Sequence, residues 1–187
     1  MSFGKIYLIL GPMYSGKTSE LIRRYRRYTV AGKKCLLVKH DNDNRYDPKK
    51  LCTHDLHKIE AKSCTKLNDL YNKIEKYDVI CIDEIQFYAD SLEFVEQVAN
   101  LGKIIVASGL SGNYRREPFK NIPELTSRSD IVVYLNAVCM ICKKEGAAFT
   151  KRISDEEAEV VVGGADKYLA VCRGCYFNKR LSITEYD

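Results

Sequence analysis

The chain has 187 residues and a mass of 21.4 kDa, the size of one domain or of one domain with a small appendage. With 45% hydrophobic and 29% charged residues it is typical of a globular chain, and no apolar run approaches the ~20 residues that span a bilayer. The net charge of +5 is too small to indicate nucleic-acid binding, although it suits an anionic ligand. Because no signal-peptide pattern precedes the first apolar run, we expect a cytoplasmic protein with no membrane and no nucleic-acid partner.

Strands and helices are predicted to alternate through the first two thirds of the chain. Continuous apolar runs, typical of parallel strands covered on both faces, predict about five strands, at 6–10, 35–38, 79–82, 104–107 and 131–135. Between them, helical periodicity predicts a helix from Thr18 to about Gly32, one over 67–74 and one with Asp90 as its N-cap. This alternation predicts an α/β fold with a doubly wound, mostly parallel sheet.

Residues 11–18, with the sequence GPMYSGKT, match the phosphate-binding pattern G-x-x-x-x-G-K-[ST]. The match lies between a predicted strand and a predicted helix, as the chemistry requires, because glycines let backbone N–H groups turn toward phosphates at a helix N-terminus. Lys17 would reach the β- and γ-phosphates of a nucleotide, and the Thr18 hydroxyl would bind Mg²⁺. A glycine-rich turn with a chance lysine is the alternative, which the flanking elements disfavour.

Two adjacent acids, Asp83 and Glu84, follow the predicted strand 79–82. An aspartate at the end of a central strand is the usual partner of the nucleotide's magnesium ion. The next residue points the other way, so Glu84 is placed to take a hydroxyl proton from a second substrate as a general base. Two alternatives remain open: Glu84 would activate water in an ATPase, or it is simply a solvated acid.

Four of the eight cysteines form two C-x-x-C pairs, Cys139 with Cys142 and Cys172 with Cys175. Two such pairs predict a closed tetrahedral site for one structural Zn²⁺, since four thiolates leave no position for a substrate. Redox-active dithiols are the alternative. Because short segments rich in cysteine and glycine begin at Cys139, we predict one domain over 1–138 and a zinc-binding domain over 139–187.

Four arginines near the phosphate loop form a basic cluster: Arg23, Arg24, Arg26 and Arg27. We interpret it as the solvated or intersubunit face of the first helix, opposite its apolar stripe, with a nucleic-acid patch as the alternative. His40, His54 and His57 share no spacing that indicates a site.

Four segments together resemble the thymidine kinase family of the cellular and poxviral type (type II), from about Lys5 to Leu181. They are the phosphate loop, DEIQF at 83–87, GLSGNYRREPF at 109–119, and GGADKY at 163–168 framed by the cysteine pairs. The resemblance implies a P-loop NTPase-like sheet with a small zinc-ribbon-like domain carrying a lasso loop. It further implies phosphoryl transfer from ATP to the 5′-hydroxyl of thymidine and of deoxyuridine, in pyrimidine deoxynucleoside salvage. A homotetramer with one zinc per chain and feedback inhibition by dTTP are also implied.

The resemblance also implies residue roles. The ATP and magnesium side would be Gly11, Ser15, Gly16, Lys17, Thr18 and Asp83, with Glu84 as the general base. The nucleoside side would be Met13, Phe87, Leu110, Tyr114, Phe119, Thr150, Val161, Val162, Gly163 and Tyr168. The last four lie in the lasso loop, which would close over the nucleoside.

The chain departs from the family pattern at three places. It has one residue more between Cys142 and Thr150, with Gly146 the predicted insertion. In the segment 53–57, Leu56 lies where the family commonly has a basic residue after the matching histidine. A cation that stabilises the transition state from the loop 40–58 would therefore be His57, Lys58 or Arg45. Tyr114 stands where the family usually has phenylalanine.

Two functions from other classes share some of these motifs. A zinc-ribbon ATPase that binds nucleic acid would hydrolyse ATP faster with DNA or RNA, and its binding would depend on salt. A nucleotide-dependent switch protein would bind nucleotide tightly and turn it over very slowly.

Overall fold

The computed structural model describes residues 4–41, 50–52, 58–156, 158, 161 and 163–178. Arg45, His54, His57 and Val162 lie outside the described residues, as does the side chain of Lys58. The chain forms two compact units. The first contains residues up to Ile9 together with Lys17–Gly109 and Lys120–Val133, and the second contains Leu10–Gly16, Leu110–Phe119 and the chain from Tyr134 onward.

A six-stranded sheet with the order β5-β2-β6-β7-β1-β8 organises the first unit. Its strands are β1 (Lys5–Gly11), β2 (Cys35–His40), β5 (Lys62–Cys64), β6 (Val79–Ile82), β7 (Ile104–Leu110) and β8 (Ile131–Tyr134). The pairings of β2 with β5 and β6, and of β6 with β7, are parallel. All five predicted strands are present, and the α/β prediction is confirmed. The sixth strand, β5, was not predicted because its three residues contain no apolar run.

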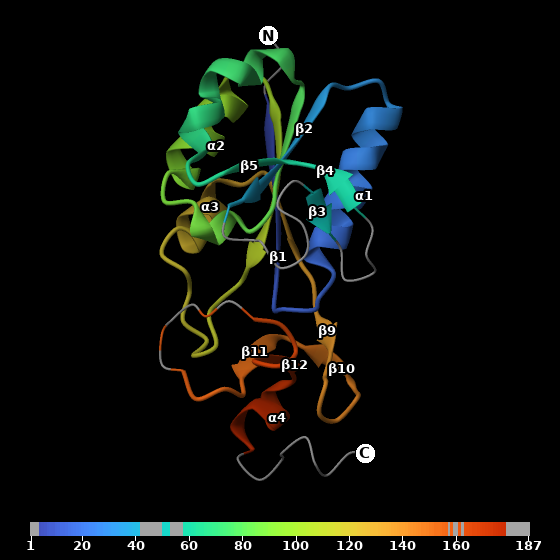
Figure 1. Cartoon of the computed structure of the whole chain (residues 1–187), viewed down its shortest axis with the longest axis vertical. Coiled ribbons are helices and arrows are strands. Elements are labelled where there is room, and N and C mark those ends of the chain that lie inside the picture. Colours follow the sequence, from blue (N-terminus) through green and yellow to red (C-terminus); the bar gives the residue numbers. More distant parts are fainter. Residues whose placement is uncertain are drawn as a thin grey trace. The chain divides into compact units, whose positions relative to one another are not determined.

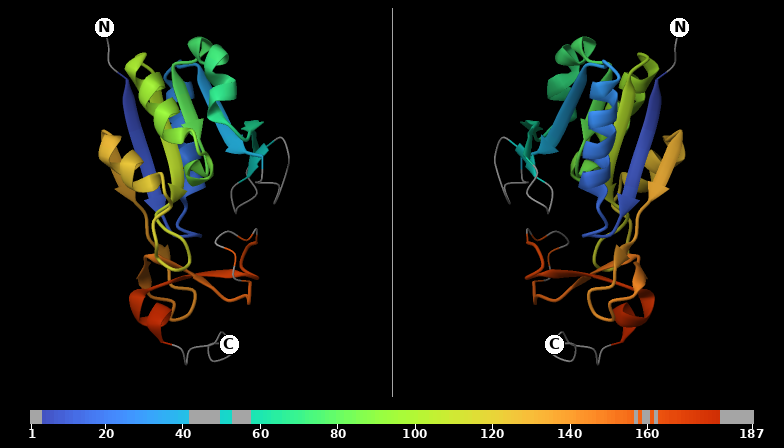
Figure 2. Two further views of the ribbon diagram at one scale, coloured as in Figure 1. Left: turned by 90° about the vertical axis from the view of Figure 1, so that its left-hand side faces the viewer. Right: turned by 90° about the vertical axis from the view of Figure 1, so that its right-hand side faces the viewer.

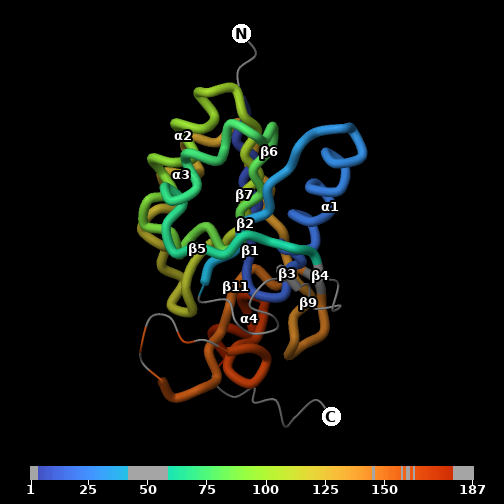
Figure 3. Tube along the Cα trace, turned by 45° about the horizontal axis from the view of Figure 1, so that its top comes forward, coloured from blue at the N-terminus to red at the C-terminus, as the bar shows by residue number. Residues whose placement is uncertain are grey.

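Helices cover both faces of this sheet. Helix α1 (Lys17–Val30) lies on one face, while α2 (Ser91–Asn100) and α3 (Ile122–Arg128) lie on the other (Figures 1 and 2). Helix α1 buries Leu21 and Ile22 against the sheet. The segment η1 (Leu67–Lys76) packs beside α2, and Figure 3 traces both. Among the described residues, no helix has the length and apolar character to cross a membrane.

The helix predicted over 67–74 is present as segment η1, a 3₁₀ helix with Leu67, Leu70 and Ile74 buried. Asp90 occupies the predicted N-cap position of α2, but its side chain does not cap that helix. The carboxylate of Asp90 makes no cap hydrogen bond to α2; it accepts hydrogen bonds from the backbone N–H groups of Leu67 (3.2 Å) and Asn68 (2.9 Å) instead. A capping side chain satisfies any exposed N–H groups within reach, and tertiary packing brings the first turn of η1 to Asp90.

The second unit contains two small antiparallel sheets and a short helix. Strand β9 (Ala137–Val138) pairs with β10 (Glu145–Ala147), β11 (Phe149–Arg152) pairs with β12 (Tyr168–Val171), and α4 (Arg173–Phe177) follows. Its core consists of Ala137, Cys139, Ile141, Ala147, Leu169, Ala170, Val171 and Cys175. A third pair, β3 (Lys50–Cys52) with β4 (Lys58–Glu60), belongs to the first unit.

Gly146, the predicted insertion, lies where the register of β9 and β10 shifts. Its φ of +87° is a conformation that glycine adopts without strain, and a bulge is how a strand pair absorbs one extra residue. The bulge leaves the next pair regular, with Thr150 opposite Ala170.

Candidate functional site

The phosphate loop has the backbone that its glycines predict. Gly16 has a φ of +81°, and a side chain at Gly11 would lie 2.4 Å from the Leu135 carbonyl oxygen and 2.6 Å from the Ser15 hydroxyl. Ser15 donates its hydroxyl hydrogen to the Pro12 carbonyl at 2.9 Å, which closes the turn. The loop leads directly into α1, whose N-terminal N–H groups and dipole favour a bound phosphate.

Asp83 is fixed through both carboxylate oxygens at the end of β6. It is 3% exposed and accepts hydrogen bonds from the Thr18 hydroxyl (3.0 Å) and the Ser108 hydroxyl (2.5 Å). Thr18 lies in the first turn of α1, so two oxygen ligands of the kind that Mg²⁺ prefers come together in the first unit. These residues fit a magnesium ion bound with a nucleotide.

Glu84 adopts a left-handed backbone conformation, with φ 52° and ψ 46°. This conformation is uncommon for residues other than glycine, and such residues cluster at active sites. The side-chain amide of Gln86 donates a 2.7 Å hydrogen bond to the Glu84 carboxylate. A side chain at Gly109 would lie 2.7 Å from the Gln86 amide oxygen, so glycine on β7 leaves room for this arrangement.

Asn121 holds the turn that carries Glu84. Its amide nitrogen donates to the carbonyls of Ile85 (3.1 Å) and Tyr88 (3.2 Å) and to the Ser91 hydroxyl (2.7 Å). The short helix η2 (Ile85–Phe87) is therefore connected to both α3 and α2.

The four cysteine sulfurs of the two C-x-x-C pairs lie within 4.8 Å of one another. The sulfurs of Cys142 and Cys172 are 3.8 Å apart, which equals the edge of a tetrahedron of roughly 2.3 Å Zn–S bonds. The backbone N–H of Cys172 also donates to the Cys139 sulfur at 3.4 Å. The donor set fits a structural zinc ion, and the second unit supplies all four ligands.

The pKa values of Cys139 and Cys175 are shifted in opposite directions. Burial by itself raises the pKa of Cys139, but hydrogen bonds from the backbone of Cys172, Cys142 and Ile141 outweigh it and lower the pKa to about 6. Burial, with the neighbouring sulfurs next, raises the pKa of Cys175 to about 12. Four adjacent thiolates require a cation to neutralise them, which is the physical argument for a metal rather than a dithiol.

Several predicted nucleoside residues lie together in the second unit. Thr150 is 5% exposed on β11, and its hydroxyl accepts a 3.0 Å hydrogen bond from the backbone N–H of Met13. The buried Tyr168 donates its hydroxyl hydrogen to the Val161 carbonyl at 3.0 Å, and the Val161 N–H donates back at 3.2 Å. Thus Met13 of the phosphate loop contacts Thr150, and Tyr168 contacts Val161.

The segment 110–119 connects the remaining candidates of this unit. Leu110 and the buried Phe119 lie at its two ends, and Asn113 organises the turn by accepting the N–H groups of Arg115 and Glu117. The hydroxyl of Tyr176 donates to the Tyr114 carbonyl at 2.7 Å, which joins the segment to α4. Gly163 is half-buried in the same unit, whereas Phe87 belongs to the first unit and contacts the His40 ring.

Two of the four arginines in the basic cluster of α1 pair with an acid of their own helix. Arg23 and Arg24 both pair with Glu20, at 2.6 and 2.8 Å, and these pairs lower the pKa of Glu20. Arg26 and Arg27 are exposed. The cluster matches the solvated face of the predicted helix.

Four residues with contacts to candidate groups were missed: Ser108, Gln86, Asn121 and Arg152. The partners of Ser108, Asn121 and Arg152 lie on other elements, so no local spacing indicates them. Gln86 lies two residues from its partner Glu84, within the DEIQF segment at 83–87, and was quoted there without a role.

Comparison with known proteins decides the family. The model of the family described as thymidine kinase matches residues 4–176. This chain belongs to the thymidine kinase family. It is 49% identical over 178 residues to the thymidine kinase of vaccinia virus (strain Western Reserve), covering 95% of this chain and 99% of the viral one. It is also 47% identical over 177 residues to thymidine kinase 1 of Dictyostelium discoideum, covering 92% and 78% of the two chains.

The stretch that matches the thymidine kinase family contains every described group of the candidate site. The phosphate loop, Asp83 and Glu84, and all four clustered cysteines lie within residues 4–176. The resemblance found in the sequence is confirmed.

Proposed function

We propose that this thymidine kinase family member transfers the γ-phosphoryl group of ATP to the 5′-hydroxyl of thymidine, giving dTMP and ADP. The observation that carries the proposal is a complete phosphate loop followed by a fixed Asp83 in a chain of this family. Deoxyuridine, which lacks only the methyl group of the base, is the second substrate we expect.

On the ATP side, we assign each residue's role from its position in the phosphate loop or at the end of β6. The N–H groups of Gly11, Ser15 and Gly16 and the ammonium of Lys17 would bind the phosphates at the start of α1. Thr18 and Asp83 would hold Mg²⁺, which when bound neutralises charge on the β- and γ-phosphates.

On the acceptor side, Glu84 would orient the 5′-hydroxyl and take its proton as the oxygen attacks the γ-phosphorus. The amide of Gln86 limits the rotation of its carboxylate. A carboxylate held in one orientation loses less freedom when the substrate binds, which favours the in-line geometry.

The nucleoside pocket we propose in the second unit comprises Met13, Leu110, Tyr114, Phe119, Thr150, Val161, Val162, Gly163 and Tyr168. Phe87 of the first unit remains a further proposed nucleoside residue. These residues are mostly apolar or aromatic, and an apolar slot rewards a pyrimidine with a methyl group. The hydroxyl of Tyr114 is the feature most apt to change which analogues are accepted.

Several further properties follow from the same assignment. We propose a cytoplasmic homotetramer with one zinc per chain, inhibited by dTTP and acting without nucleic acid. We also propose a phosphate-loop domain over 1–138 and a zinc-binding domain over 139–187. A size-exclusion measurement with light scattering tests the tetramer, and metal analysis tests the zinc.

The experiment that tests the reaction is ADP release with each deoxynucleoside in turn. Thymidine should accelerate it, with one dTMP formed per ADP, and polynucleotides should not. Stimulation by DNA or RNA without any response to thymidine would exclude the kinase and favour a nucleic-acid-dependent ATPase.

A further inference from the structure

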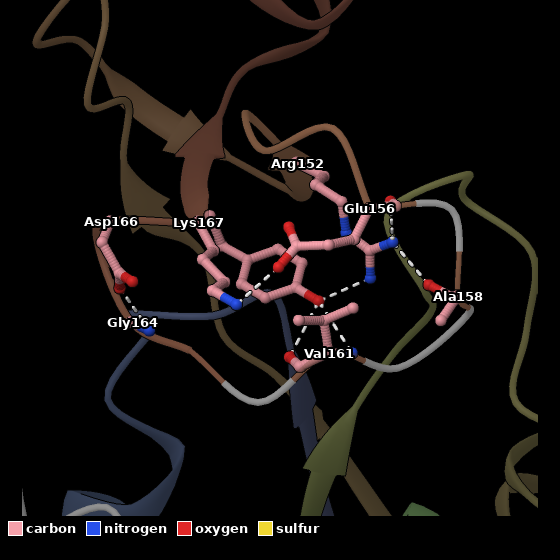
Figure 4. A network of polar contacts seen from close by, with 8 residues as sticks. Arg152, Glu156, Ala158, Val161, Gly164, Asp166 and Lys167 are labelled. Carbon is pink, nitrogen blue, oxygen red and sulfur yellow. Dashed lines mark hydrogen bonds and ion pairs between the residues drawn. The ribbon is translucent and has the colours of Figure 1, made fainter.

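Arg152, the last residue of β11, connects parts of the second unit that are distant in the sequence. Its guanidinium carbon lies 3.8 Å from the centroid of the Tyr114 ring. One nitrogen donates to the Tyr168 hydroxyl at 2.6 Å, and the other donates to the backbone carbonyls of Glu156 (2.8 Å) and Ala158. Figure 4 shows the polar part of this arrangement, which we call the Arg152 network.

The network continues beyond the guanidinium. Tyr168, which accepts from Arg152, donates its own hydrogen to the Val161 carbonyl and accepts the Val161 N–H. Close by, the Lys167 ammonium pairs with the Glu156 carboxylate at 2.6 Å (Figure 4). Backbone groups at 156, 158 and 161 are thereby connected to the first residue of β12 through one arginine and one tyrosine.

Only arginine among the side chains meets these requirements together. A planar guanidinium presents donors in a fixed fork and can stack on a ring while it donates in its own plane. Lysine would keep the charge but lacks the plane and the fork. The contacts of Arg152 also converge on Tyr114, Tyr168 and, through Tyr168, on Val161, all of which belong to the proposed nucleoside pocket.

We propose that Arg152 is a positioning residue for the nucleoside, an inference that rests on the proposed function. It does not touch the substrate: it holds the backbone carbonyls of Glu156 and Ala158 and covers one face of the Tyr114 ring. Loss of Arg152 weakens nucleoside binding because the pocket must then be ordered by the ligand itself.

The variants that test this are Arg152→Gln and Arg152→Lys, with Arg173→Gln as the matched control. Arg173 also stacks on an aromatic ring, at 5.0 Å from the Phe149 centroid, but it is exposed on α4. For Arg152→Gln we expect the thymidine KM to rise by about 10- to 100-fold, the scale of lost charge-assisted hydrogen bonds. The ATP KM and the zinc content should stay normal, and kcat should change by less than the thymidine KM. Arg152→Lys should recover only part of the loss.

A second measurement separates positioning from general destabilisation. Hydrogen exchange at the Val161 amide, which donates to Tyr168, should accelerate in both Arg152 variants and stay unchanged in Arg173→Gln. A normal thymidine KM in Arg152→Gln with intact zinc would overturn the proposal, as would full recovery in Arg152→Lys. If Arg152→Gln does not fold, the lysine variant and the exchange measurement decide. Failure of the wild-type protein to phosphorylate thymidine would instead count against the proposed function, since the exchange result does not depend on it.

Discussion

The carboxylate of Glu84 is held both by its own left-handed backbone and by the amide of Gln86. Both constraints lie in the first unit and are present before a substrate binds. A residue with this backbone costs about 1–3 kcal/mol unless its surroundings compensate, and here Asn121 fixes the turn that follows. The strain is therefore localised at the group to which we assign proton transfer.

Replacing Glu84 by glutamine tests that assignment. The new side-chain oxygen can still accept the Gln86 hydrogen bond, so the geometry is retained while the base is lost. We expect kcat to fall by at least ~10²-fold, the usual scale of general-base catalysis, with thymidine affinity preserved. Isothermal titration and steady-state rates measure the two effects. Glu93→Gln, an exposed acid on α2, is the control, and near-normal turnover in Glu84→Gln would remove Glu84 from this role.

The pKa of Glu156 reports on its ion pair with Lys167. The hydrogen bond from the Lys167 ammonium lowers the pKa of Glu156 from 4.5 to about 2. Because the folded pKa is the lower one, the pair's stabilising contribution is complete above about pH 4.5 and disappears as the pH falls toward 2. In Lys167→Met the pKa of Glu156 should rise toward its ordinary value, as an NMR titration of the carboxyl carbon would show. An unchanged pKa would mean that Lys167 does not pair with Glu156 in solution.

At the scale of elements, β7 and η2 approach so closely that only glycine fits between them. A side chain at 109 would lie 2.7 Å from the Gln86 amide and 2.8 Å from a methyl group of Ile85. On the same strand, the Ser108 hydroxyl donates a hydrogen bond to Asp83. Strand β7 therefore helps to position both Asp83 and Glu84. This explains why a residue with no chemistry of its own lies at the end of the strand.

Gly109→Ala should therefore displace Gln86 and release the Glu84 carboxylate. We expect a loss of stability of about 1–3 kcal/mol, as for other overpacked sites, and a lower kcat with little change in the ATP KM. Urea unfolding and steady-state kinetics measure both. Gly174→Ala is the control, since no atom lies within 4 Å of the added carbon. Equal behaviour of the two variants would show that the space at Gly109 is not critical.

At the scale of the whole molecule, the two compact units share the phosphate loop along the chain. Gly11 to Gly16 belong to the second unit, together with the cysteine cluster, while Lys17 and Thr18 belong to the first. We expect order in the second unit, which contains most of the proposed nucleoside residues, to matter for nucleoside binding. The four cysteines hold β9–β10 and α4 around one small core.

Cys172→Ser tests this dependence. One ligand fewer should release zinc and raise the thymidine KM by about 10- to 100-fold, the range seen when supporting groups of metal sites are removed. The melting temperature should fall, and metal analysis, kinetics and calorimetry measure the three effects. Cys35→Ser, outside the cluster, should change none of them. Full zinc content in Cys172→Ser would contradict the four-cysteine site.

Local patterns in the sequence determined much of this protein. Apolar runs predicted five strands, the glycines of 11–18 predicted the phosphate loop, and the two C-x-x-C pairs predicted the sulfur cluster. Each of these signals lies within a few neighbouring residues, where backbone conformation and periodicity act directly. The family resemblance rested on the same segments and is confirmed over residues 4–176.

Only the tertiary structure decided which residues support the site. Asp90 lies at the N-cap position of α2, as predicted, but its carboxylate accepts the N–H groups at the start of η1, which lies 23 residues earlier. Ser108, Asn121 and Arg152 act on groups contributed by other elements, 25, 36 and 16 residues away along the chain. A hydrogen bond depends on where two atoms meet in space, and that position is set by the packing of the whole chain rather than by the residues beside either partner.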